Sequence, residues 1–467
     1  MELEHISPRH KKAIRAYSFK LTKKTPMTQP ITSNKAEDVV LHHNSERFSL
    51  RKLADKGFWA LIDKGLFASS NFFLNVLLAN WLSQQEYGSF SVALAIFFLV
   101  SVFHTTLISE PMLVFGPGKY RDQLPDYLGV ILWGHCALAA LGSVVILVGA
   151  LFVYFIGQSA LALSLVAMAI ASPCILLQWI MRRITYINAT PHLAAFAGSL
   201  YLIAMVAGIS SLYSFRLLSA ASALGVMAVS SVFAVWWMIK GIPVKAVLEN
   251  RILFRSCVED HRNYGGWATG TALLRWIPSN FYYVLLPIWG GLEASAALRA
   301  LMNLLVPFQN MTLALGDVLV PTLVKVKRGR VFNSLVVKTL ILSLLGSGLY
   351  WFALTMFGAT IMQWIYGGGY IEHAGLLWVI ALSVVFATLA SVFGIFLRAA
   401  NKPDLIFRAY VCAMIVTLPF ALWATAIFGL AGAGFSITLG SFMTAAVMAW
   451  FCWRGVWSAG NKETRTL

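Results

Sequence analysis

The chain has 467 residues, of which 59% are hydrophobic and only 12% carry a charged side chain. Soluble globular domains carry about a quarter charged residues, so the composition excludes an ordinary soluble protein and indicates a membrane protein. Lys and Arg (36) outnumber Asp and Glu (19), which gives a net charge of +17. In a soluble protein this charge would indicate a nucleic-acid partner, so the positions of the basic residues along the chain have to be considered.

Residues 1–56 begin the chain with a polar, basic segment that lacks the apolar core of a secretory signal. We expect this segment to be a disordered cytoplasmic tail. Apolar runs follow it to the end of the chain, each close to the length of about 20 residues that a helix needs to cross a bilayer. Cutting the chain at its polar interruptions gives twelve predicted spans: 57–82, 88–109, 127–154, 159–181, 192–213, 217–239, 264–290, 294–320, 331–357, 375–397, 405–428 and 431–453.

Lys and Arg gather on one side of the predicted membrane. The tails and loops on the side of the N-terminus, which we call the basic side, hold nearly all of those outside the spans, whereas the loops of the opposite, far side hold only Arg216. Such an asymmetry places the basic side in the cytoplasm. We therefore expect both termini to be cytoplasmic, attribute the net charge to membrane topology, and expect no nucleic-acid partner.

The two halves of the chain show signs of an internal repeat. Six spans lie on each side of a basic segment, so both halves enter the membrane in the same orientation. The pattern Ser-Asn-Phe-Phe at 70–73 returns in the seventh span as Ser-Asn-Phe-Tyr at 279–282. We predict an all-α membrane protein whose twelve transmembrane helices form two parallel six-helix lobes around a central cavity. The predicted parts are a first lobe at 57–239, a basic cytoplasmic linker at 240–263, a second lobe at 264–453 and a cytoplasmic tail at 454–467.

The seventh span carries a charge at mid-depth. Arg275 lies near its middle, where a cation costs about 2.5 to 3.5 kcal/mol on insertion scales, so the side chain should face protein or water rather than lipid. Thr271, Ser279 and Tyr282 share its helical face. The alternative is an Arg that joins two helices by donating to backbone carbonyls.

A longer polar stripe runs along one face of the eighth span, in steps of four and seven residues: Ser295, Arg299, Asn303, Asn310 and Asp317. Arg299 lies near the far-side end, where its guanidinium could also extend to the membrane surface. The continuous row of polar residues favours a face turned towards the cavity.

In the first span, Lys64, Asn71 and Asn75 share a helical face, and Asp63 stands next to Lys64. For Asp63 and Lys64, contact with the membrane surface or a local ion pair is the alternative.

The candidates for coupling transport to H⁺ or Na⁺ are Asp63, Asp317 and His104. A hydrogen-bonded core residue is the alternative for His104. The five cysteines are odd in number and widely spaced without a CxxC pair, which excludes a disulfide framework and a thiolate metal site. We expect no cofactor and no metal site.

Basic residues on polar stripes, without carboxylates in the middle of the spans, would make the cavity electropositive. A phosphate-bearing ligand would offset the desolvation of its guanidinium groups through charge-assisted hydrogen bonds. The residues predicted to bind this ligand are Arg275, Arg299, Lys64, Asn71, Asn75, Ser279, Tyr282, Asn303 and Asn310.

The segment Leu-Leu-Ala-Asn-Trp-Leu-Ser-Gln-Gln-Glu-Tyr-Gly at 77–88, followed by an apolar run, resembles the opening of bacterial polysaccharide-biosynthesis flippases. These belong to the multidrug/oligosaccharidyl-lipid/polysaccharide exporter superfamily. Asn80 and Ser83 stand where the family pattern has Arg and Gly.

The resemblance implies a cavity lined by the first, second, seventh and eighth spans. It implies a flippase, not an enzyme, that moves a polyprenyl-diphosphate-linked oligosaccharide across the bacterial cytoplasmic membrane by alternating access. In this hypothesis Arg275, Arg299 and Lys64 hold the diphosphate and the sugar head while the polyprenyl tail stays in lipid. The implied partners are the lipid-linked oligosaccharide, membrane lipids and other glycan-assembly proteins.

Two other functions remain open at this point. A drug or cation antiporter of the same architecture would need a carboxylate deep in the cavity, and the spans offer only peripheral acids. A membrane glycan polymerase or ligase would need a sizeable far-side loop with catalytic groups. The longest far-side loop, 358–374, holds only Glu372 and His373 as titratable side chains apart from two tyrosines.

Overall fold

The protein is described from a computed structural model, which covers residues 50–242, 251–325, 330–400 and 402–454. The chain divides into two units, Met1–Asp55 and Lys56–Leu467. Of the first unit the structure describes only the start of the first helix, so most of the predicted tail 1–56 lies outside the described residues. Everything below concerns the second unit.

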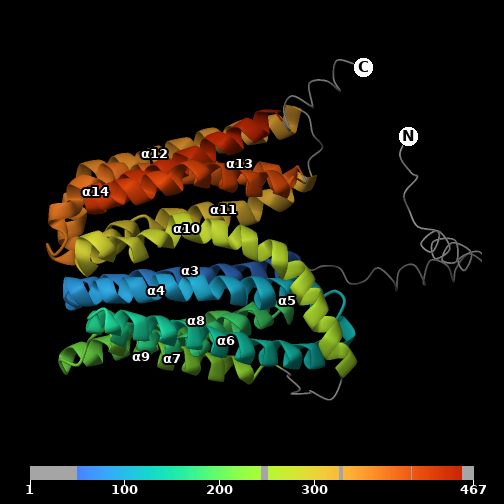
Figure 1. The fold of residues 1–467 in the computed structure, drawn as a ribbon. Helices are drawn as coiled ribbons and strands as arrows, with labels where there is room; N and C mark the ends of the chain where they lie inside the picture. Colours follow the sequence, from blue (N-terminus) through green and yellow to red (C-terminus); the bar gives the residue numbers. More distant parts are fainter. Residues whose placement is uncertain (1–49, 243–250, 326–329, 401, 455–467) are drawn as a thin grey trace, which may run out of the picture. The chain divides into compact units, whose positions relative to one another are not determined.

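All the regular structure in the described residues is helical (Figure 1). The first half contains α3 (Leu50–Trp81), α4 (Gln84–His104), the π-turn η1 (Thr105–Ser109), α5 (Glu110–Phe115), the 3₁₀ turn η2 (Arg121–Gln123), α6 (Leu124–Phe155), α7 (Ser159–Ile187), α8 (Pro191–Ser214) and α9 (Ala220–Ile239). The second half contains α10 (Arg251–Asn303), α11 (Val306–Lys325), α12 (Arg330–Tyr366), the 3₁₀ turn η3 (Ile371–Leu376), α13 (Leu377–Ala399) and α14 (Pro403–Cys452).

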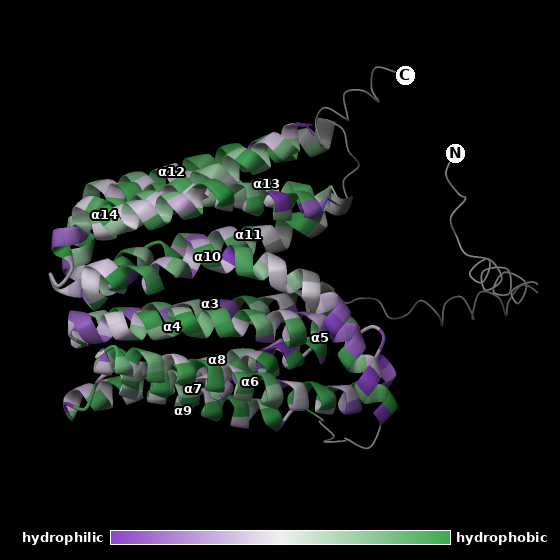
Figure 2. Ribbon diagram, viewed as in Figure 1, coloured by the Kyte–Doolittle hydropathy of each residue, from purple (hydrophilic) through white to green (hydrophobic). Residues whose placement is uncertain are grey.

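The helices have the length and the surface of membrane-spanning segments. Among the described residues, nine helical segments are long and apolar enough to cross a bilayer. Large hydrophobic side chains such as Val148 and Phe152 on α6 and Leu345 and Leu349 on α12 are exposed, as expected for helices that face lipid. Figure 2 shows hydrophobic residues along the helices and a hydrophilic cluster at the start of α10. The chain is a multi-pass membrane protein.

Two of the predicted far-side loops are reversals at a single glycine. Gly291 in α10 (φ 72°, ψ 175°) and Gly429 in α14 (φ 54°, ψ −126°) each separate two helical arms. The Ser295 hydroxyl donates to the carbonyl of Tyr283 across the α10 reversal, at 2.9 Å. Side chains are strained in these positive-φ conformations, so glycine is required to keep such turns short.

Two predicted spans are not continuous α-helices. The eighth span breaks at residues 304–305, between α10 and α11, because Pro307 cannot donate a backbone N–H and disfavours helical geometry in the residue before it. The predicted continuous stripe from Ser295 to Asp317 is therefore wrong as a single helical face. The second span changes to the π-turn η1 after His104. This turn lies two to six residues before Pro111, whose ring would clash with the carbonyl four residues earlier in an unbroken helix.

The helices form two lobes, which we call the first lobe (α3 to α9) and the second lobe (α10 to α14). Within the first lobe α6 packs on α7 and α8 on α9, within the second α13 packs on both α12 and α14, and α10 contacts both α4 and α14. The exact limits predicted for the lobes stay a prediction. Residues 243–250 of the predicted linker lie outside the described residues, and from Arg251 onwards the linker is already helical.

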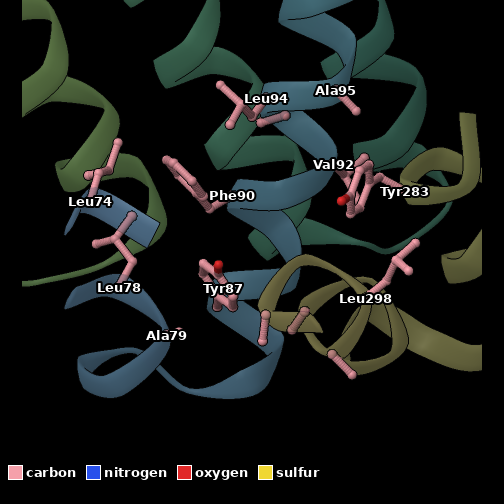
Figure 3. Packing of buried hydrophobic residues seen from close by; sticks show 14 of the residues in the cluster. Leu74, Leu78, Ala79, Tyr87, Phe90, Val92, Leu94, Ala95, Tyr283 and Leu298 are labelled. Carbon is pink, nitrogen blue, oxygen red and sulfur yellow. The ribbon is translucent and has the colours of Figure 1, made fainter. Parts of the chain in front are cut away.

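The largest cluster of buried apolar side chains is shared between the lobes on the far side. This cluster joins the far-side halves of α3, α4, α10, α12 and α13, and Figure 3 shows Tyr87 and Phe90 of α4 in the same core as Tyr283 and Leu298 of α10. Two separate clusters fill the basic-side halves. One surrounds Tyr127 and Ile184 in the first lobe and includes Leu253 and Cys257 from the start of α10, and the other lies in the second lobe. Apart from the start of α10, the apolar packing between the lobes is therefore concentrated on the far side.

The start of α10, Arg251–Asn263, which we call the α10 leg, runs across the basic-side end of the first lobe (Figure 1). Asp260 accepts hydrogen bonds from Lys119 Nζ (2.7 Å) and from the Tyr120 hydroxyl (2.6 Å). Burial alone would raise the pKa of Asp260, but these two hydrogen bonds hold it below its usual value. His261 Nδ1 donates to the carbonyl of Leu107 at 2.8 Å.

A substitution at Gly429 tests the assigned turn between the two arms of α14. We expect Gly429→Ala to lower the free energy of unfolding by roughly 1 to 3 kcal/mol, because alanine is strained at its positive φ. Gly225→Ala is the matched control, since Gly225 lies inside α9 and the position that an added Cβ would occupy is open. The control should keep or slightly raise the stability. Thermal unfolding in detergent measures both, and equal stability of the two variants would contradict the assigned turn.

Candidate functional site

A polar cavity of about 330 Å³ lies among α10, α11, α13 and α14, with one residue, Asn75, contributed by α3. Arg275 and Arg299 both line it. Hydroxyl and amide groups form much of the remaining wall: Ser279, Asn303, Gln309, Ser383, Ser391, Ser441 and Thr444. The cavity therefore combines two cations with neutral groups that can donate and accept hydrogen bonds.

The Arg299 side chain bridges the lobes beside this cavity. Its Nη2 donates to the carbonyl oxygen of Ser91 in α4 at 3.0 Å, and its guanidinium carbon lies 3.8 Å from the centre of the Tyr283 ring. Its Nε is buried and has no hydrogen-bond partner. A buried N–H of a cation without an acceptor costs free energy, so an anionic group arriving at this point would be stabilised.

Arg275 lies one helical turn before Ser279 and is exposed to the cavity. The carbonyl of Arg275 accepts a hydrogen bond from the Ser279 hydroxyl at 3.1 Å, which fixes that side chain against the helix. In the part of the chain that the structure describes, no carboxylate oxygen lies within ion-pairing distance of Arg275 or Arg299. The positive charge of the cavity is therefore not neutralised by these residues.

The predicted binding residues fall into two groups. Arg275, Arg299, Asn75, Ser279 and Asn303 line the cavity together. Four others do not: Lys64, Asn71, Tyr282 and Asn310.

Those four lie elsewhere for local reasons. Lys64 is exposed near the basic-side end of α3, and Asn71 donates to the carbonyl of Phe67 one turn earlier in the same helix. Tyr282 is buried in the apolar core, and its neighbour Tyr283 takes the place by Arg299 instead. Asn310 lies beyond the helix break, so it does not continue the row of Arg299.

The three coupling candidates have different surroundings. Asp63 is 1% exposed and forms an ion pair with Arg182 of α7, with both carboxylate oxygens 2.8 Å from Arg182 Nε, and it also accepts from the Tyr186 hydroxyl. His104 is buried with its Nε2 3.0 Å from Nδ1 of His135. The side chain of Asp317 lies outside the described residues. No three His, Cys, Asp or Glu side chains in the described ranges gather closely enough to hold a metal ion.

Sequence reasoning missed the wall of the cavity made by α13 and α14. Ile437, Gly440, Ser441 and Thr444 line it at intervals of three, one and three residues, the spacing of one helical face. This run of small and hydroxyl residues within an apolar span was the available signal. The second span contributes no lining side chain, only the carbonyl of Ser91 to Arg299.

The segment at 77–88 closes the far side. Asn80 Nδ2 donates to the carbonyl of Ile365 at 2.7 Å, and Gln84 Nε2 donates to the carbonyl of Gly369 at 2.8 Å, so both join the first lobe to the end of α12 and its loop. Glu86 accepts from the backbone N–H of Ala220 at the start of α9, at 2.6 Å. The Tyr87 hydroxyl donates to Asn75 Oδ1 at 3.1 Å, which orients the cavity residue of α3.

Known structures share this fold. An inward-facing multidrug resistance MATE family transporter of the MOP superfamily superposes with a TM-score of 0.69 at 13% identity, over 85% of this chain and 98% of the other. The lipid II flippase MurJ in an inward closed conformation gives a TM-score of 0.66 at 14% identity, over 86% and 87%. The Vibrio cholerae MATE transporter VcmN gives 0.58 at 13%, over 89% and 97%.

The chain has the fold of these transporters. It consists of twelve transmembrane helices in two six-helix lobes around a central cavity, as predicted. No protein-family model matches the sequence, and no curated protein matches it at a significant level. At these identities the likeness establishes the fold, and the function has to be argued from the cavity.

The ion pair between Asp63 and Arg182 is expected to be structural. Asp63→Ala leaves Arg182 without its partner in a buried setting, and we expect a loss of about 3 kcal/mol in the free energy of unfolding. Lys119→Met is the control, because it removes an ion pair to Asp260 whose lysine is 50% exposed, and it should cost at most about 1 kcal/mol. Thermal unfolding in detergent measures both, and a smaller loss for Asp63→Ala would contradict this assignment.

Proposed function

We propose that the protein is a flippase that moves a polyprenyl-diphosphate-linked oligosaccharide across the cytoplasmic membrane during polysaccharide export. The observation that carries the proposal is the pair of guanidinium groups in the cavity, Arg275 and Arg299, to which the described residues offer no carboxylate partner. A diphosphate supplies the missing negative charge and accepts charge-assisted hydrogen bonds from both.

The rest of the wall suits a sugar. Ser383, Ser391, Ser441 and Thr444 present hydroxyl groups, and Asn303 presents an amide held by the Tyr366 hydroxyl at 3.3 Å. The cavity volume of about 330 Å³ is at the low end for small-molecule sites. In our proposal it holds the diphosphate and the adjoining sugar, while the polyprenyl tail remains in lipid. The likeness in fold to the lipid II flippase MurJ supports a lipid-linked substrate for this chain.

The drug or cation antiporter is the second candidate, because MATE transporters have the same fold. A cationic substrate would need a carboxylate in the cavity. The described side chains that line it include two arginines and no acid. This charge favours the anionic substrate.

Alternating access follows from the way the lobes are joined. Their shared apolar core and the hydrogen bonds of Asn80 and Gln84 lie on the far side, whereas the basic-side cores are separate. We propose that the substrate enters from the basic side, and that rocking of the lobes breaks the far-side contacts and releases it there.

For coupling, we propose that a proton is taken up at the pair His104 and His135. Of the coupling candidates with described side chains, Asp63 is held by Arg182 and Tyr186, whereas Nδ1 of His104 is buried without a hydrogen-bond partner. The pair lies directly before η1, which contacts α10 through Thr106 and Thr269 hydroxyls 2.7 Å apart, so a change of charge there can reach the second lobe.

Removal of either guanidinium tests the substrate site. We expect Arg275→Ala and Arg299→Ala to insert normally but to bind a diphosphate-linked sugar about tenfold to hundredfold more weakly, through loss of hydrogen bonds to a charged group. Export should stop, and lipid-linked intermediates should accumulate in the cytoplasmic leaflet. Arg216→Ala, on the far-side loop, is the control and should export normally.

Two outcomes would overturn this function. One is normal export by both cavity variants at equal abundance in the membrane. The other is transport of a cationic dye by the purified wild-type protein in vesicles with no flipping of the lipid-linked sugar, which would identify the antiporter instead.

Replacement of His104 tests the coupling. In vesicles with an imposed pH gradient, His104→Gln should keep substrate binding but lose the dependence of flipping on the gradient, because glutamine cannot take up the proton. His192→Gln is the control, since His192 is exposed at the start of α8. A His104→Gln variant that responds to the gradient like the wild type would exclude this site.

A further inference from the structure

A second cavity lies on the basic side, between the first lobe and the α10 leg, and shares no lining residue with the polar cavity. It is an apolar groove of about 600 Å³ between η1, α6 and the α10 leg. Its walls include Leu107, Val130, Trp133 and Leu138. Trp133 is 49% exposed, so the groove reaches the outer surface of the helices.

A polar depression adjoins this groove on the α10 leg. It is lined by Arg255, Glu259, Arg262 and Asn263, together with two apolar residues. Three residues, Phe254, Val258 and Arg262, line both the groove and the depression. An apolar compartment and a basic compartment are therefore continuous.

The charge of the depression is positive. Arg255 and Arg262 are exposed, and in the described ranges neither lies within ion-pairing distance of Glu259, the acid beside them. Phe254 and Val258 are also exposed, at 39% and 48%. A helix that presents arginines beside exposed apolar side chains is typical of the interface between headgroups and acyl chains.

The surroundings of the groove make it a fixed site rather than a loose surface. The α10 leg is anchored to the first lobe by Lys119 and Tyr120 through Asp260, and His261 is held between the Tyr127 hydroxyl (2.7 Å) and the carbonyl of Leu107. The groove therefore keeps its walls without a ligand.

We propose that this site binds one anionic phospholipid of the leaflet on the basic side. Its phosphate lies against Arg255 and Arg262, and an acyl chain fills the groove between Trp133, Leu138 and Val258. The occupant is a lipid rather than a free anion because the basic depression opens into an apolar compartment. It is an anionic lipid because two arginines face a single glutamate.

Native mass spectrometry of the purified full chain tests the site with two probes, phosphatidylglycerol and phosphatidylethanolamine. We expect the wild type to retain phosphatidylglycerol preferentially. The double variant Arg255→Gln/Arg262→Gln should bind it about twenty-fivefold more weakly, at about fivefold for each basic residue near a headgroup. Arg216→Gln, on the far-side loop, should bind as the wild type does.

A second variant separates the tail from the headgroup. Ala137→Trp fills the groove, and it should lower phosphatidylglycerol retention while Val148→Trp, elsewhere on the exposed face of α6, should not. Equal retention of the two lipids by the wild type, or no effect of Ala137→Trp in a folded protein, would overturn the proposal. Preferential displacement of phosphatidylglycerol by a polyprenyl monophosphate would overturn it in favour of a tail site for the transported substrate. The proposal does not depend on the flippase function.

Discussion

Apolar packing on the far side holds the two lobes together, and the rest of the structure depends on it. Tyr87, Phe90, Tyr283 and Leu298 belong to one buried cluster that crosses between α4 and α10. On the basic side there are two separate clusters, and the one in the first lobe takes in only the start of α10 from the second. The polar cavity lies among α10, α11, α13 and α14, with Asn75 of α3, and gives room to charged side chains that could not be buried in a continuous apolar core.

The charged side chains inside the helical core fall into two groups, those with an oppositely charged partner and those without a described one. Asp63 and Arg182 form an ion pair within the first lobe, and this pair joins α3 to α7. Arg275 and Arg299 face the cavity without such a carboxylate among the described residues. A structural charge has its partner within the fold, and the absence of a carboxylate from the described walls of the cavity is the basis on which we propose an anionic substrate.

Most of the fold could be predicted from the sequence, because the length and spacing of apolar runs report directly on membrane crossings. The mid-depth position of Arg275 was likewise enough to place it in the cavity. Helical periodicity failed at 304–305, where Pro307 breaks the helix and takes Asn310 out of the row. It also could not decide between the adjacent rings of Tyr282 and Tyr283, or show that Asp63 would meet Arg182, since such choices depend on which helices pack together.

The far-side bonds of Asn80 and Gln84 are accepted by main-chain oxygens of Ile365 and Gly369. Main-chain acceptors are present whatever side chain a residue carries. Substitutions at the acceptor positions 365 and 369 can therefore leave these hydrogen bonds intact, provided that the path of the backbone is kept. The two donor amides have no such freedom, so divergence between relatives should be uneven across the contact, with the selective constraint falling on α3 and α4.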